Sequence, residues 1–439
     1  MKRSAAWTTT RATIVAALAY AAVGCGTSDI LPSPTITSDS PLSSDGASAI
    51  ALPDAYTAVL LRAVSEPTFP FLGSDGKYHI AYDLLLTNAS EVPAQIDAID
   101  VLDAAAQQRV IVSYTDKELV DPNCPFGNCN RLRRLPSSAA SDRAIPAQES
   151  RALLVDFAFD TLAAVPKVVV HRVRGRAATN PGAHEPSAID YLVTPFELAA
   201  AAPRVIAAPL KGRHWVALNG CCLPGFPHRT SLAPLNGKLV NGQRFAIDWK
   251  RLNDDGRFFV GDPTQNESYV DYGESIYAVA DGTITATLDE LEANTPGILP
   301  ADDPVLAPQI TVSNVDGNHI VQDIGGGLSA FYAHLQKDSL RVKPGDHVTK
   351  GQVIAKLGNT GNSNAAHLHF QLMSGSSVLG SDGVPYVLEQ FDYDGRIPLD
   401  LIAGLDDYLS GEFFTGLLAA PEPRSEQLPV AWAIVDFPE

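Results

Sequence analysis

Residues 365–373 read AAHLHFQLM, and the alternation within this stretch decides how it folds. Residues i and i+2 of a β-strand project from the same face. One face of the expected strand is apolar and should join a core; it carries Leu368, Phe370 and Leu372. The opposite face is polar and carries His367, His369 and Gln371. Taken alone, the two histidines fit either a surface that faces water or the edge of a metal site.

A second stretch, RFAIDW at residues 244–249, alternates in the same way. Its apolar face carries Phe245, Ile247 and Trp249, and Asp248 lies opposite. A single aspartate on a strand is ordinary. If this strand lies beside the His-Leu-His strand, however, a carboxylate and two imidazoles meet in one groove, which favours a divalent cation.

Two further histidines lie between or near these stretches. SAFYAHLQ at residues 329–336 places Tyr332 and His334 in alternation with Phe331, Ala333 and Leu335. FPHRT at residues 226–230 places His228 in a loop flanked by proline. Each histidine by itself is well explained as a surface residue, but their grouping with Asp248 favours a shared site.

The order of these motifs resembles a known family. His228, Asp248, VADGTI, FYAHL, GDHVTKGQVIAKLGNTGNS and HLHF follow one another as in the lysostaphin-like, or LytM-type, zinc metallopeptidases that cut peptidoglycan cross-bridges. The resemblance covers about residues 226–395 and implies a mainly β fold with an antiparallel β peptidase domain. It implies that Zn2+ is bound by His228, Asp248 and His369. It also implies that His334 and His367 handle the proton of the attacking water and the developing oxyanion.

One interval departs from the family pattern. The family commonly places its first histidine four residues before the aspartate, whereas His228 precedes Asp248 by twenty, with RTSLAPLNGKLVNGQR between them. A loop can bridge such an interval at a small entropic cost. His214 is the substitute candidate, although it lies further from Asp248 and has no motif around it.

The residue types are also coherent without the family. Three ligands of the His, Asp, His type leave the fourth tetrahedral position to water, as in catalytic zinc sites. Zinc lowers the pKa of bound water from about 15.7 to roughly 7. His334 or His367 would accept the proton while the other stabilises the oxyanion, in either order. The bond cleaved could be Gly-Gly, D-Ala to a diamino acid, or a bond in a peptide outside the wall.

An inactive scaffold and a carrier domain are alternatives to a peptidase. Relatives that lost zinc ligands act as inactive scaffolds or activators of other cell-wall hydrolases, but here all five expected site residues have a candidate. The hairpin VKPGDHVTKGQVIAKLG also resembles biotinyl and lipoyl carrier domains. A carrier needs an acceptor lysine at a hairpin tip in its own motif, which Lys350 and Lys356 lack.

The N-terminus predicts export. Lys2, Arg3 and Arg11 precede the apolar run ATIVAALAYAAVGC, so residues 1–24 are expected to be a signal peptide. AAVGC resembles a bacterial lipoprotein cleavage site with Cys25 as the lipid attachment residue, except that Ala22 replaces the usual leucine. We therefore expect an extracytoplasmic protein anchored by lipid to the membrane, and Gly26 favours the outer membrane in a Gram-negative cell.

The rest of the chain divides by composition. Residues 25–50 are rich in Ser, Thr, Pro and Asp and are expected to be a disordered tether. Residues 51–195 hold short apolar runs such as YHIAYDLLLTN, which favour an immunoglobulin-like β-sandwich that contacts other envelope proteins. The peptidase domain is expected over 205–395 and a tail without assigned function over 396–439. Residues 287–309 are expected to form a loop that serves as a substrate wall or lid.

Cysteines and charge complete the expectations. Cys124 and Cys129 bracket a Pro-Gly turn in an exported chain and are the natural disulfide pair. Cys221 and Cys222 are adjacent and could form a vicinal bridge or stay reduced. The net charge of −18 falls further without the signal peptide, which argues against nucleic acid as a partner.

Overall fold

The computed structural model describes residues 54–64, 68–106, 109–121, 123–124, 129–199, 201–403 and 405–439. The predicted signal peptide, the lipid attachment residue Cys25 and the tether lie outside these residues. Among the residues that are described, no helix is both long and apolar enough to cross a membrane. The fold is mainly β, which confirms the predicted class.

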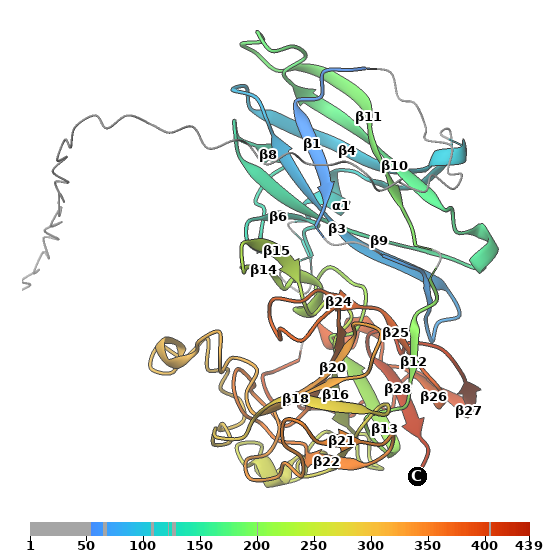
Figure 1. The fold of residues 1–439 in the computed structure, drawn as a ribbon, viewed down its shortest axis with the longest axis vertical. Coiled ribbons are helices and arrows are strands. Elements are labelled where there is room, and N and C mark those ends of the chain that lie inside the picture. Colours follow the sequence, from blue (N-terminus) through green and yellow to red (C-terminus); the bar gives the residue numbers. More distant parts are fainter. Residues whose placement is uncertain are drawn as a thin grey trace, which may run out of the picture. The chain divides into compact units, whose positions relative to one another are not determined.

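Residues 59–197 form two antiparallel sheets whose inner faces share one hydrophobic core, in the upper part of Figure 1. The first sheet runs β1-β3-β9-β6-β7, with β2 on β3: β1 (Val59–Ala63), β2 (Phe71–Leu72), β3 (Tyr78–Asn88), β6 (Leu132–Arg134), β7 (Ser138–Ala139) and β9 (Ser150–Phe159). The second runs β11-β10-β4-β5, with β8 on β4: β4 (Ala94–Asp103), β5 (Val110–Tyr114), β8 (Ala144–Ile145), β10 (Val168–Ala177) and β11 (Ser187–Glu197). The immunoglobulin-like assignment of this region stays a prediction.

An antiparallel sheet of eleven strands follows, with the order β21-β18-β19-β20-β23-β16-β13-β28-β26-β27 and with β24 paired to β23. Its first strands along the chain are β13 (Gly212–Leu218), β16 (Ile247–Arg251), β18 (Gly282–Leu288), β19 (His319–Asp323), β20 (Ser329–Ala333) and β21 (His347–Val348). The others are β23 (Leu368–Met373), β24 (Gly383–Val384), β26 (Phe391–Arg396), β27 (Leu417–Arg424) and β28 (Ala433–Phe437). Strands β16 and β23, which carry the polar residues of interest, are therefore central neighbours.

Smaller elements surround this sheet. Three strand pairs are β12 (Arg204–Ile206) with β25 (Tyr386–Leu388), β14 (Leu232–Leu235) with β15 (Lys238–Asn241), and β17 (Ser275–Tyr277) with β22 (Val353–Lys356). The α-helices of the described chain are single turns, α1 (Asp116–Leu119) and α2 (Leu399–Ile402). Short 3-10 turns include His228–Thr230.

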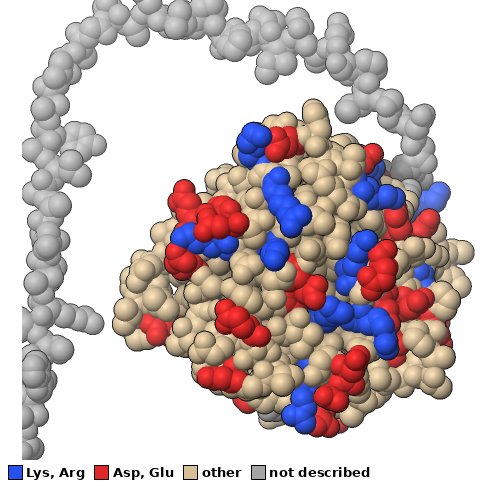
Figure 2. Space-filling view, turned by 90° about the horizontal axis from the view of Figure 1, so that it is seen from below, with Lys and Arg blue, Asp and Glu red and all other residues tan. Residues whose placement is uncertain are grey.

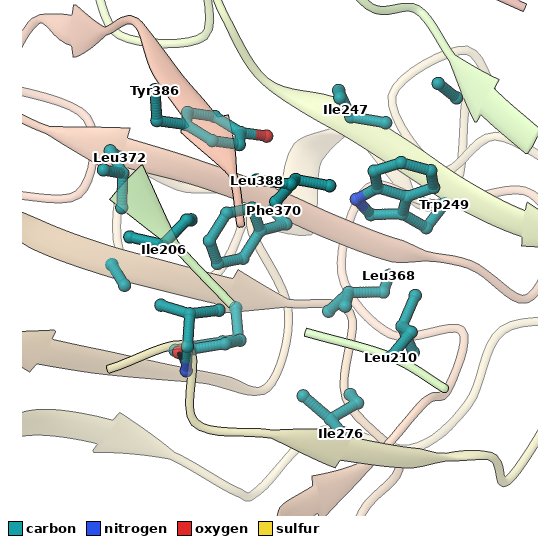
Figure 3. Close-up of a cluster of buried hydrophobic side chains, with 14 of the residues drawn as sticks. Ile206, Leu210, Ile247, Trp249, Ile276, Leu368, Phe370, Leu372, Tyr386 and Leu388 are labelled. Atoms are coloured by element: carbon teal, nitrogen blue, oxygen red, sulfur yellow. Dashed lines mark hydrogen bonds between the residues drawn. The ribbon is translucent and has the colours of Figure 1, made fainter. Parts of the chain in front are cut away.

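The apolar faces expected on β16 and β23 both point into the main core. Figure 3 shows Ile247 and Trp249 from β16 beside Leu368, Phe370 and Leu372 from β23. All five side chains are fully buried. Burial of these faces turns the alternate residues of both strands to the other side of the sheet.

Residues 396–439, set apart by composition as a tail, contribute to the same sheet. Strand β28 lies between β13 and β26, with Trp215 opposite Val435. The sheet therefore gains its far edge from the end of the chain.

Both cysteine pairs of the described chain are joined by disulfides. Cys124 bonds to Cys129, and Cys221 bonds to Cys222 across a cis peptide bond. The vicinal bridge is thus the alternative that the structure adopts for Cys221 and Cys222.

Charged side chains of both signs are interspersed on the face shown in Figure 2. Ion pairs of the described chain include Lys337 with Glu292 and Lys350 with Glu389.

Candidate metal centre

Strand pairing brings Asp248 and His369 together. On β16 and β23 these two residues lie directly opposite each other in the antiparallel register. Nδ1 of His369 is 2.9 Å from Oδ1 of Asp248. The two strands are therefore neighbours in the sheet, which is the arrangement that would bring Asp248 and the histidines together.

His228 reaches the same carboxylate from the 3-10 turn. Its Nε2 lies 3.2 Å from Oδ2 of Asp248. The potential ligand atoms of His228, Asp248 and His369 all lie within 4.8 Å of one another, and all three residues are buried. The long interval between His228 and Asp248 is thus spanned, and the three side chains expected to bind the metal converge.

The hydrogen bonds of His228 define which ring nitrogen is free. Its Nδ1 lies 3.0 Å from the carbonyl oxygen of Ala246, so Nδ1 carries the proton and donates. Nε2 then presents a lone pair to the carboxylate of Asp248. Two acceptors at 3.2 Å require a positive charge between them, either a proton or a metal ion, and a backbone carbonyl that fixes the tautomer is usual for metal ligands. The donor set therefore fits zinc.

The electrostatics of Asp248 agree with this. Burial raises its pKa, but the charges and hydrogen bonds of His228 and His367 outweigh burial and hold the pKa well below its usual range. Asn219 also donates from Nδ2 to Oδ2 of Asp248 at 2.7 Å. The carboxylate is therefore ionised and oriented.

His334 and His367 lie side by side next to this group, with ring centroids 4.6 Å apart. Nδ1 of His334 donates to the carbonyl of Thr360 and Nδ1 of His367 to that of Ala365, both at 2.8 Å. Nε2 of His334 is thus available as an acceptor, whereas Nε2 of His367 lies 3.4 Å from Oδ1 of Asp248. Burial and the neighbouring charges of His367 and His369 hold the pKa of His334 well below its usual range, which keeps this imidazole neutral.

The position of His334 differs from simple alternation. Tyr332 faces the core, where its hydroxyl donates to Gln322, so a continued strand would turn His334 to the core as well. Strand β20 instead ends at Ala333, and His334 has a φ of 63°. This left-handed residue breaks the alternation and turns the imidazole toward His367 and His369.

His214, the substitute candidate, belongs to another cluster. Its potential ligand atom lies within 4.8 Å of those of Asp394 and Asp436. Arg213 contacts Nε2 of His214 at 3.0 Å and Oδ2 of Asp436 at 3.3 Å. A guanidinium therefore already supplies the positive charge in that cluster.

Sequence reasoning missed a buried ion pair beneath the site. Lys250 lies two residues after Asp248 on β16, and its ammonium is 3.7 Å from Asp271 and donates to the carbonyl of Ala366. That carbonyl directly precedes His367. The alternation that singled out Asp248 also places Lys250 on the same face, so the signal was present.

A cavity of about 450 Å³ adjoins the site. Asp316 and Gln371 line it, and Oε1 of Gln371 is 3.0 Å from Nε2 of His369. Burial raises the pKa of Asp316 to about 6 despite the opposing charge of His369. The remaining lining comes from both sides of the site: Ser231, Ala233, Leu235, Gly242, Gln243, Ile310, Thr311, Val312, Val315, Val378 and Leu379.

The loop expected to form a wall is tied down near the histidines. Asn294 donates to the carbonyls of Gly361 and Ser363, and the backbone of Gly297 donates to Asn364. None of the residues 287–309 lines the cavity beside the metal ligands; the lining residues on this side follow that loop, within 310–316.

A buried His, Asp, His group with two further imidazoles beside it is typical of metal-dependent hydrolases. Residues 268–380 match the sequence profile of Peptidase family M23, so the chain carries a LytM-type domain of this family. The match includes His334, His367 and His369, whereas His228 and Asp248 precede it.

Curated relatives agree over a short stretch. The chain is 46% identical over 59 residues to lysostaphin from Staphylococcus simulans, which covers 13% of this chain and 12% of that protein. It is 52% identical over 59 residues to the glycyl-glycine endopeptidase ALE-1 from Staphylococcus capitis, covering 13% and 16%. The chain thus matches less than a fifth of the length of these relatives.

Solved structures were also matched. The catalytic domain of lysostaphin from Staphylococcus simulans is 25% identical, covers 34% of this chain and 80% of its own, and has a TM-score of 0.19. A zinc-containing peptidase from Vibrio cholerae is 14% identical, covers 72% and 83%, and has a TM-score of 0.22. These TM-scores are low, so the family match rests on the sequence.

Proposed function

We propose that this protein is a zinc metalloendopeptidase that hydrolyses peptide cross-links of peptidoglycan. The observation that carries the proposal is the convergence of His228, Asp248 and His369 beside His334 and His367. The match to Peptidase family M23 and the similarity to two staphylococcal proteins support the reaction class.

His228, Asp248 and His369 would hold the metal. Bound zinc would supply a water of lowered pKa and polarise the scissile carbonyl. His334 and His367 have their Nδ1 protons committed to backbone carbonyls. With Asp248 engaged by the metal, their Nε2 atoms would accept a proton from the attacking water and pass it to the leaving amine.

The cavity beside His369 suits part of an extended peptide. Its lining is largely apolar or small, and Asp316 and Gln371 place polar groups at the end nearest the metal ligands. Such a lining would bind small side chains of a wall peptide while the polar groups orient the backbone.

The envelope location is part of the same proposal. A signal peptide over 1–24 and lipid attachment at Cys25 would hold the enzyme at the membrane, with residues 26–50 as a tether. Attachment by two or more acyl chains is stable, unlike attachment by one.

The alternative is an inactive scaffold that activates other cell-wall hydrolases. The presence of all five site residues in one place favours the enzyme, since loss of ligands characterises the scaffold. Zinc content separates the two functions.

The test is elemental analysis of the purified chain after reconstitution with zinc, with His228→Ala alongside. The proposal expects about one zinc per chain and its loss in the variant. Wild-type protein that takes up no zinc would instead establish the scaffold function.

A further inference from the structure

We infer that Asp83, on the first sheet of the N-terminal region, is a positioning residue for the zinc ligand His228; this inference rests on the proposed function. Asp83 lies on β3, far from the metal centre in the sequence. Its side chain is completely buried. It contacts three residues of the segment 228–244, which begins at His228 and ends shortly before Asp248.

Arg229, the residue after His228, forms the first of these contacts. Its side chain is 1% exposed, and Nη1 pairs with Oδ1 of Asp83. Nη2 donates to the carbonyls of Tyr82 on β3 and Val155 on β9, at 2.9 and 3.1 Å. The guanidinium is therefore inserted between two strands of the first sheet.

The geometry of the turn separates the two neighbouring side chains. His228 and Arg229 belong to a 3-10 turn, in which successive side chains point about 120° apart. When Arg229 is held in the first sheet, His228 points to Asp248. The position of the imidazole thus depends on the anchor of the next residue.

The other end of the segment is tied to the same carboxylate. Asn241 donates from Nδ2 to Oδ2 of Asp83 at 2.9 Å and to the carbonyl of Arg229 at 3.2 Å. Nε of Arg244 lies 3.4 Å from Oδ2 of Asp83. One buried carboxylate therefore fixes both ends of the unusually long interval between His228 and Asp248.

Packing around this network is continuous. Leu232 of β14 packs against Ala152 and Leu154 of β9, and Figure 1 shows the β14–β15 hairpin beside the first sheet. The hydroxyl of Ser137 donates to the carbonyl of Thr230. The N-terminal region would accordingly support the metal site, in addition to its expected contacts with other envelope proteins.

The test measures zinc affinity of the full chain by competition with a chromogenic chelator. Asp83→Asn removes the charge that holds Arg229, and we expect the Kd for zinc to rise about tenfold to a hundredfold. At saturating zinc the hydrolysis rate should return to that of the wild type, because no group that touches substrate has changed.

Asp100→Asn is the matched control. Asp100 is 2% exposed on β4 and pairs with Arg174 at 2.9 Å, so it is also a buried ion-paired aspartate of the N-terminal region. Its contacts do not involve residues 228–244. We expect its zinc Kd to stay within about threefold of the wild-type value, since general destabilisation leaves His228 in place.

Asn241→Ala covers the case in which Asp83→Asn does not fold, as judged by near-ultraviolet circular dichroism. It removes one tie without leaving a charge unpaired and should weaken zinc binding in the same direction. A folded Asp83→Asn with wild-type zinc affinity overturns the inference, as does unchanged affinity in Asn241→Ala when Asp83→Asn is unfolded. Wild-type protein without zinc affinity would overturn the proposed function itself.

Discussion

His367 and His369 are separated by one residue, yet their ring nitrogens have different partners. Nδ1 of His369 faces Asp248, whereas Nδ1 of His367 donates to a backbone carbonyl. Nε2 of His367 lies 3.4 Å from Asp248, further than the ligand atoms of His228 and His369. The group whose potential ligand atoms all lie within 4.8 Å of one another includes His369 and not His367, which supports a ligand role for His369 and proton transfer for His367.

Substitution of each histidine should separate the two roles. His369→Ala should lose both zinc and hydrolysis of peptidoglycan. His367→Ala should keep zinc and lose about 100-fold to 10,000-fold in rate, since general acid-base groups contribute that much. Zinc content and release of soluble wall fragments are the measurements.

His347 provides the control for these variants. It is exposed on β21 and contacts Thr283 outside the site. His347→Ala should keep both zinc and rate. Retention of zinc by His369→Ala would contradict the ligand role.

At the scale of elements, the segment 310–316 forms one wall of the cavity beside the metal centre. Val312 lines this cavity and is 67% exposed. Val305 is 72% exposed in the same loop region and is not part of the lining. The two valines thus differ in location and not in burial.

Val312→Asp should therefore raise the KM for wall peptide by about tenfold, because a charge replaces an apolar contact in a pocket. Val305→Asp should leave KM unchanged. Steady-state kinetics on a defined peptide measures both, and equal effects would show that the cavity does not bind substrate.

Strands β3 and β10 hold another buried histidine. His171 accepts a hydrogen bond from the hydroxyl of Tyr82 at 2.7 Å, and burial lowers its pKa from 6.5 to about 4. Between pH 6.5 and 4, His171 is therefore protonated in the unfolded chain but neutral in the folded protein. Stability should be unaffected above pH 6.5 and should fall as the pH drops from 6.5 to 4.

The shift corresponds to a loss of about 3 kcal/mol of unfolding free energy at pH 4. His171→Gln keeps an acceptor for Tyr82 and has no titrating group, so its stability should depend less on pH in this window. Urea unfolding at pH 7 and pH 4 tests this; an identical pH dependence in both proteins would contradict the assignment.

At the scale of the whole molecule, residues 50–439 form one compact unit. Phe71 and Ala81 of the first sheet belong to the same hydrophobic cluster as Trp249 and Phe370. The Asp83 network adds buried charge pairs across the same boundary. The predicted sandwich and peptidase regions thus share a hydrophobic core and are not connected by a linker alone.

Thermal unfolding of the full chain should consequently show a single cooperative transition. Calorimetry should give a van't Hoff enthalpy close to the calorimetric one. Two resolved transitions would mean that the two regions unfold independently.

Much of the site could be predicted because it depends on local pattern. Alternation is a property of a few consecutive residues, so the sequence by itself determined that Asp248 and His369 lie opposite their apolar neighbours. The resemblance to LytM-type peptidases then ordered the histidines. The direction of the His334 side chain could not be predicted from alternation, because strand β20 ends at Ala333 and His334 itself has a left-handed backbone conformation. A local hydrophobic pattern does not reveal such a residue.

Only the tertiary structure decided which distant residues meet. The pairing of β16 with β23 brings Asp248 next to His369, although 121 positions separate them in the sequence. Strand β28 of the same sheet comes from residues 396–439, which composition had set apart as a tail. His228 reaches Asp248 because the segment between them is anchored to Asp83, a residue in a different region of the chain. Strand faces are set by backbone geometry within a segment, whereas these contacts exist only after burial has brought separate segments together.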